Sequence, residues 1–139
     1  MKTFFERELS KILCYVPKIN FYDWHFIDGK RAYCSYKSMK FKVEFAFSFA
    51  IDKYDEIVVT AINPNSSEVD RLYIKFADVI GKIPTNNPNF TDGLSLSTWK
   101  DRSNYGDCQG YGWYVVRPTE EHYKLLAEKI GEYITLFSE

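Results

Sequence analysis

The chain lacks an excess of charge of either sign. Its 139 residues include 18 Lys and Arg against 19 Asp and Glu, which leaves a formal net charge of -1 at pH 7. Without a global basic field, the protein has no long-range attraction for nucleic acid or for an anionic membrane surface. We therefore expect neither partner, and a protein partner would have to be recognised by a local surface.

Cysteine and histidine are also scarce. Cys14, Cys34 and Cys108 form no Cys-x-x-Cys pair, and His25 and His122 lie 97 positions apart. Because zinc sites depend on short-spaced ligand pairs, we expect no bound metal. Three cysteines in a chain long enough to bury a core indicate a reducing compartment, so we expect a cytoplasmic protein.

Long apolar runs and phosphate-binding glycine loops are missing as well. The most apolar stretch is interrupted by Lys42 and Glu44, and charges from Glu6 to Glu8 would interrupt the apolar segment of a secretory leader. The glycines between 106 and 112 are spaced irregularly and lead toward a strand, so they do not resemble a nucleotide-phosphate loop. We expect no membrane span and no resident cofactor.

Aromatic residues, in contrast, are abundant: 11 Tyr, 11 Phe and 3 Trp make up 18% of the chain. Between Lys40 and Ile51, large apolar residues alternate with small or charged ones. A helix would spread them around its circumference, whereas a strand places them on one face. The apolar positions are Phe41, Val43, Phe45, Phe47, Phe49 and Ile51. We predict a strand in the interior of an antiparallel sheet, because an exposed edge of this kind would promote aggregation.

Two amphipathic helices are predicted at the ends of this sequence. The pattern Thr3-x-x-Glu6 is a capping box, and apolar residues then recur at helical spacing over about residues 4–15. Thr119 is a suitable N-cap for a second helix that runs to about residue 136, with Gly131 as a weak point within it. Both helices need a sheet on which to bury their apolar stripes.

Further strands are predicted in the middle of the chain. Residues 20–38 form a hairpin around Asp28-Gly29, and residues 56–62 form a β-branched strand. Residues 68–83 fit a strand or a helix, and we favour a helix over their second half. Short strands are also expected within 94–100 and 113–117. The predicted fold is one α+β domain of residues 1–139, with a single mostly antiparallel sheet of four to six strands packed by the terminal helices.

The hairpin turn determines which side chains meet. With a two-residue turn, Trp24 lies opposite Tyr33 and Tyr22 opposite Ser35 on one face. The loop from Lys37 to Lys40 then decides which hairpin face joins the apolar face of the next strand. An even loop places Cys34 and Tyr36 beside Phe41 and Val43, and an odd loop places them on the other side.

The same register would put Asp23, His25 and Cys34 on one face of the hairpin. A carboxylate, an imidazole and a thiol are the components of an activated nucleophile. Two strand residues and one across from them share a face often by chance, however, and the sequence offers no identifiable oxyanion donors. We therefore expect no catalytic residues and a protein that is not an enzyme.

An aromatic segment at residues 84–113 is the strongest candidate binding surface. It is rich in Asn, Pro, Gly and Ser, yet it carries rings, amides and cations of the kind enriched at interfaces. The candidate residues are Trp99, Lys100, Arg102, Asn104, Tyr105, Gln109, Tyr111 and Trp113. Trp99 and Trp113 would equally fit core positions of short strands. We predict a binding protein of the inhibitor, immunity-protein or adaptor type.

A second hypothesis places a ligand on the sheet. Tyr22, Trp24 and Tyr33 would form a platform for a planar group, making the protein a small-ligand or nucleotide sensor. The same cluster could instead seat a terminal helix, which we favour. Apolar groups on both faces of the hairpin also allow a homodimer.

Overall fold

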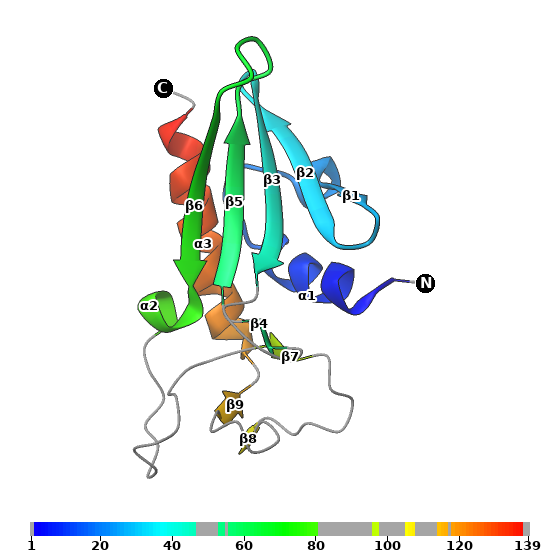
Figure 1. The fold of residues 1–139 in the computed structure, drawn as a ribbon, viewed down its shortest axis with the longest axis vertical. Coiled ribbons are helices and arrows are strands. Elements are labelled where there is room, and N and C mark those ends of the chain that lie inside the picture. Colours follow the sequence, from blue (N-terminus) through cyan, green and yellow to red (C-terminus); the bar gives the residue numbers. More distant parts are fainter. Residues whose placement is uncertain are drawn as a thin grey trace.

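A five-stranded antiparallel sheet forms the centre of the fold (Figure 1). The computed structural model describes residues 2–46, 53–54, 56–80, 96–97, 105–107, 114–116 and 118–137. The strands are ordered β1-β2-β3-β5-β6, so each pairs with its neighbour along the chain apart from the excursion through β4. The prediction of an α+β fold with terminal helices on an antiparallel sheet is confirmed.

The predicted helices and strands occur along the chain in the expected order, and the structure adds a 3-10 helix at residues 21–23 and short strands at 53–54 and 105–107 that were not predicted. The sheet contains β1 (His25–Ile27), β2 (Arg31–Tyr36), β3 (Met39–Ala46), β5 (Glu56–Ile62) and β6 (Val69–Lys75). The helices are α1 (Phe4–Leu13), the 3-10 helix η1 (Phe21–Asp23), α2 (Phe76–Ile80) and α3 (Glu120–Leu136). Two small sheets pair β4 (Lys53–Tyr54) with β7 (Leu96–Ser97), and β8 (Tyr105–Asp107) with β9 (Tyr114–Val116).

The central strand is β3, as the alternation of the Phe-rich stretch predicted. Phe41 and Val43 are fully buried and Phe45 is buried, whereas Lys42 and Glu44 between them point to the other face. β3 lies between β2 and β5, with Phe41 opposite Cys34 on one neighbour and Ala61 on the other. Positions 47–51 of the predicted ribbon lie outside the described residues.

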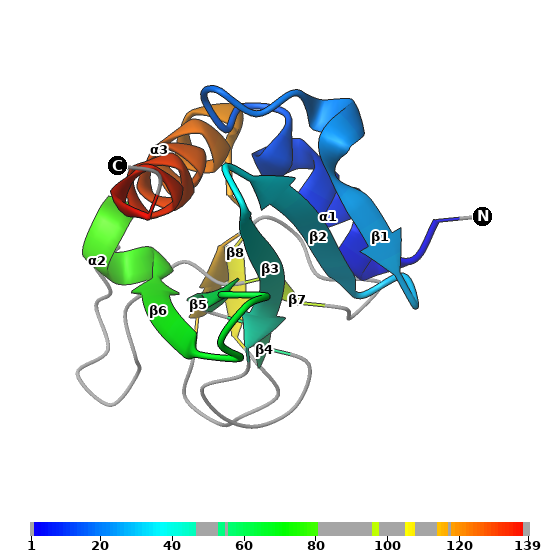
Figure 2. The ribbon, with the colours of Figure 1, turned by 90° about the horizontal axis from the view of Figure 1, so that it is seen from above.

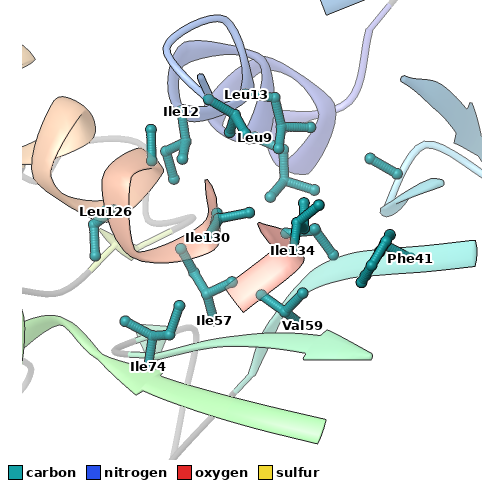
Figure 3. Close-up of a cluster of buried hydrophobic side chains, with 14 of the residues drawn as sticks. Leu9, Ile12, Leu13, Phe41, Ile57, Val59, Ile74, Leu126, Ile130 and Ile134 are labelled. Carbon is teal, nitrogen blue, oxygen red and sulfur yellow. The ribbon is translucent and has the colours of Figure 1, made fainter. Parts of the chain in front are cut away.

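Helices α1 and α3 cover one face of this sheet (Figure 2). Their apolar stripes meet the inward side chains of β3, β5 and β6 in a single cluster (Figure 3). The largest fully buried members are Leu9, Ile12, Leu13, Phe41, Val43, Ile57, Phe76, Leu126, Ile130 and Ile134. None of the described helices is long and apolar enough to cross a membrane.

Polar contacts join α1 to α3 within this layer. Glu8 is a buried acid of α1, and its two carboxylate oxygens accept from the Tyr123 hydroxyl at 2.7 Å and from Lys11 Nζ at 2.7 Å. The Tyr15 hydroxyl, just past α1, donates to Glu120 Oε1 at 2.5 Å. Since a buried charge needs partners, these bonds fix how the two helices lie against each other.

Both helices begin at the caps that the sequence predicted. The Thr3 hydroxyl accepts from the Glu6 N–H at 3.1 Å, and the Thr119 hydroxyl accepts from the His122 N–H at 3.4 Å. His122 completes the second cap, because its Nδ1 accepts from the Thr119 N–H at 3.0 Å. Burial lowers the pKa of His122, which keeps that nitrogen free to accept.

The predicted register of the first hairpin is wrong by one residue. Asp28 and Gly29 do form the turn, both with positive φ (55° and 71°), but Lys30 is an additional loop residue and Ile27 pairs with Arg31. His25 therefore lies opposite Tyr33, the position predicted for Trp24. The turn dipeptide was identified correctly, whereas the extra residue after it was not.

The second hairpin has an even loop. Lys37 and Ser38 form a two-residue turn with positive φ at both positions (47° and 71°), which matches the twist of the flanking strands. Cys34 consequently lies opposite Phe41 on the covered face. Of the two registers that the sequence left open, this is the one that extends the core across β2.

The ambiguous stretch after β5 contains both predicted elements. Alternation holds through β6, which pairs with β5 over its full length, and the chain then turns into α2 at Phe76. Phe76 is fully buried and its ring meets Phe45 edge-on, with 6.4 Å between centroids. A strand followed by a short helix accounts for both the alternating and the helical spacing of the apolar residues. The helix lies in the second half of the stretch, as predicted.

Candidate functional site

The aromatic segment at 84–113 lies almost wholly outside the described residues. Of the eight candidate binding residues only Tyr105 is described, as the first residue of β8, where it pairs with Val116 of β9. The others lie outside the described residues: Trp99, Lys100, Arg102, Asn104, Gln109, Tyr111 and Trp113. Their role in binding stays a prediction.

The three rings of the alternative platform do not share one surface. Trp24 is 4% exposed and belongs to the core, whereas Tyr22 lies on η1 and is 84% exposed. Tyr33 points to the opposite face of the sheet, beside Lys42. η1 causes this separation, because it occupies residues 21–23, where it is capped by Asn20 through a bond from the Tyr22 N–H at 2.9 Å, and β1 begins only at His25.

A hollow of about 260 Å³ is lined in part by Asp23, His25 and Cys34, the three residues considered above as an activated nucleophile. β1 is shorter than β2, so the last residues of β2 extend past it, and the chain of η1 lies beside them. The lining residues are Asp23, His25, Tyr33, Cys34, Ser35 and Lys40. All three residues line the hollow, but their side chains do not share a face: His25 lies on the side of the sheet that carries Tyr33, whereas Cys34 lies on the covered side with Phe41.

The chemistry of this hollow argues against a thiolate. Cys34 is 2% exposed, and burial, with a smaller contribution from the Asp23 carboxylate, raises its pKa to about 12. An activated cysteine needs the opposite shift, produced by a cation or a helix N-terminus. At neutral pH the thiol stays protonated and acts as a small apolar group between β1 and β3.

We expect alkylation to separate the two described cysteines. At about pH 8, iodoacetamide should modify exposed Cys14 well before buried Cys34, which should react only on unfolding. Peptide mapping by mass spectrometry after timed labelling gives the two rates. Equal labelling rates in the native protein would contradict the burial of Cys34.

The raised pKa of Cys34 also predicts how the free energy of unfolding depends on pH. Because the thiol has an ordinary pKa of 9.0 in the unfolded chain, its contribution to the free energy of unfolding should be constant below about pH 9.0 and should decrease at higher pH.

The face of the sheet opposite α1 and α3 carries charged, aromatic and aliphatic side chains, although Val58 and Thr60 at its centre are buried. No described helix or strand lies over it (Figures 1 and 2). One row across the strands runs Ile27, Arg31, Glu44, Val58 and Tyr73, and the next runs His25, Tyr33, Lys42, Thr60 and Arg71. We call these two rows the helix-free face.

Ion pairs hold the charged side chains of the helix-free face in place. Arg31 Nε lies 3.3 Å from Glu44 Oε1, and Lys42 Nζ lies 3.0 Å from Glu44 Oε2. Arg31 Nη1 also contacts Asp28 Oδ2 at 2.6 Å. Apolar groups project beside them, since Ile27 is 55% and Tyr73 60% exposed. The helix-free face therefore carries an ordered set of charged side chains, with the Tyr73 ring at the β6 edge of the sheet and the Ile27 side chain at the β1 edge.

Comparison with known proteins identifies no relative of this chain. No protein-family model, no curated protein and no solved structure matches the chain. In the described part of the chain, no group of three or more His, Cys, Asp or Glu is placed to hold a metal ion.

Proposed function

We propose that this is a non-enzymatic binding protein of the inhibitor, immunity-protein or adaptor type, which docks a protein partner. Two surfaces carry the proposal: the aromatic segment at 84–113 and the helix-free face. The supporting observation is that Tyr73 and Ile27 are exposed beside the ordered Arg31–Glu44–Lys42 pairs. Aromatic and arginine side chains are enriched at protein interfaces, and pre-ordered charges lose little entropy on binding.

Other features fit this proposal better than its alternatives. The raised pKa of Cys34 disfavours hydrolase chemistry at the hollow that Asp23, His25 and Cys34 line. A nucleotide sensor has less support, because Tyr22, Trp24 and Tyr33 do not share a surface. The proposal includes a cytoplasmic location, consistent with the free thiols of Cys14 and Cys34.

Affinity capture with matched variants tests the proposal. Immobilised wild-type protein should retain a specific partner, and Tyr73→Ala, Trp99→Ala or Arg102→Ala should weaken that binding at least about tenfold, as loss of an interface hot spot does. Tyr22→Ala is the control, because Tyr22 is also an exposed tyrosine but lies outside the helix-free face.

Three outcomes count against the proposal. Equal retention by all variants would remove both surfaces from the interface. Stabilisation of the protein by nucleotides in a thermal-shift screen, by about 2.7 kcal/mol at 100 times the dissociation constant, would favour the sensor. A Trp99→Ala protein whose circular dichroism is that of an unfolded chain would assign the ring to the core.

A further inference from the structure

A second hollow lies where the β5–β6 turn, the start of β3 and the end of α3 meet. Its volume is about 420 Å³, within the range of small-ligand sites. The lining residues are Met39, Ala61, Asn63, Glu68, Val69, Asp70 and Phe137. It is separate from the helix-free face and from the hollow around Cys34, so the inference drawn from it rests on the proposed function only in that the partner is a protein.

The polar side of this hollow is acidic and unneutralised. Glu68 and Asp70 are both exposed, and neither forms an ion pair with any described residue. Among the described residues that line the hollow, none carries a positive charge. The site therefore presents two carboxylates to whatever enters it.

Asp70 is held in position by α3. The Tyr133 hydroxyl donates to Asp70 Oδ2, and burial together with this bond raises the pKa of Tyr133, so the donor keeps its proton. The bond engages one carboxylate oxygen and leaves the other to meet a ligand. A carboxylate whose rotamer is fixed in advance binds with a smaller entropy cost.

Glu68 is carried by an ordered turn. The Asn63 N–H donates to the Glu68 carbonyl at 3.0 Å, and the Ser67 N–H donates to the Asn63 carbonyl at 2.9 Å. The Asn63 side chain accepts from the Asn65 N–H at 3.0 Å, and Ser67 takes a positive φ of 61°. The backbone that places Glu68 is thus tied to the end of β5.

The opposite side of the hollow is apolar and includes an aromatic ring. Met39 and Phe137 are half-buried, and Ala61 is buried. The Phe137 ring packs edge-on against Tyr133 at 5.1 Å and Phe41 at 6.2 Å between centroids, which holds it in place. A ring with fixed orientation can stack on a planar cation, and a thioether adapts to an aliphatic stem.

We infer that this hollow binds the side chain of an arginine in a peptide segment of a partner protein. A guanidinium group is planar, permanently charged and able to bond two carboxylates at once, while it stacks on an aromatic face. The aliphatic stem of the arginine would pack against Met39 and Ala61 on the apolar side of the hollow. A hard metal ion fits less well, because two carboxylates beside an apolar wall supply too few oxygen ligands.

Titration with short blocked peptides tests the inference. The probe is acetyl-Gly-Arg-Gly-amide, and the matched control is the same peptide with citrulline, which keeps the shape and loses the charge. In ¹⁵N–¹H spectra of the full chain, the arginine peptide should shift the amides of Asn63, Glu68, Asp70 and Phe137 in a saturable way. Added salt should weaken the effect. Equal shifts with the citrulline peptide, or no shift at these amides with either peptide, would overturn the inference.

Two variants separate binding from folding. Glu68→Gln and Asp70→Asn should each weaken the arginine peptide about tenfold, the usual loss for one charged hydrogen bond. Glu68 is on a surface turn, so its variant stays informative if Asp70→Asn disturbs Tyr133. Asp78→Asn is the control, because Asp78 is an exposed acid on α2 that does not line the hollow. Unchanged affinity in both test variants, with native circular dichroism, would refute the site, whereas loss of partner capture by the helix-free-face variants bears only on the proposed function.

Discussion

Replacing Phe41 by alanine should lower the free energy of unfolding by about 3 to 5 kcal/mol, the usual cost of removing a fully buried ring. Phe41 is 0% exposed and lies on the central strand, paired with a neighbouring strand on each side. Its cross-strand neighbours Cys34 and Ala61 are small, and the Phe137 ring is 6.2 Å away. Small neighbours cannot fill the space left by the ring, so the cavity should persist. Urea unfolding followed by circular dichroism measures the loss.

Tyr73→Ala provides the matched control for Phe41→Ala. Tyr73 is an aromatic residue of the same sheet, but it lies on the helix-free face and is 60% exposed. Its removal should change the free energy of unfolding by less than about 1 kcal/mol, the span of strand propensities. A comparable loss in both variants would mean that the two faces of the sheet are equally covered, contrary to the arrangement described.

Gly131→Ala should also destabilise the protein, by on the order of 2 kcal/mol, the middle of the range for overpacking. Helix propensity alone predicts the opposite, a gain of about 1 kcal/mol over glycine within a helix. The structure reverses the sign, because a Cβ at position 131 would lie 2.8 Å from Pro17 Cδ and 2.9 Å from Pro17 Cγ. A proline ring is bonded to the backbone on both sides and cannot move away without shifting the loop after α1.

A double-mutant cycle isolates the contact between Gly131 and Pro17. In a Pro17→Ala background, where the ring is gone, Gly131→Ala should become neutral or stabilising. Thermal unfolding of the four proteins under identical conditions gives the interaction energy. If Gly131→Ala stabilises the wild-type protein, α3 does not pass Pro17 as closely as described.

Local patterns in the sequence predicted most of the fold. Alternation placed β3 in the centre, a β-branched run indicated β5, and two capping residues, Thr3 and Thr119, located the starts of α1 and α3. Each of these signals depends on residues within a few positions of one another. Periodicity and caps act locally, so a single sequence is sufficient to identify them.

Register and site were harder to predict, because they depend on the exact length of a turn or on segments that are distant in the chain. Nothing in Asp28-Gly29 indicates that Lys30 adds a residue to the loop, yet that residue moves His25 into the place predicted for Trp24. The acidic hollow combines side chains from β3, the β5–β6 turn, β6 and the end of α3. No local spacing links these positions, so only the folded chain brings them together.

The pairing of α1 with α3 has a consequence for how the protein is made. A ribosome completes α1 and all five strands of the main sheet before it begins α3. Until then the apolar side of Phe41, Val59 and Ile74 has only one of its two covering helices, and Glu8 lacks the Tyr123 hydroxyl. Until α3 has been made and has left the ribosome, the nascent chain exposes an incomplete apolar layer to which chaperones can bind.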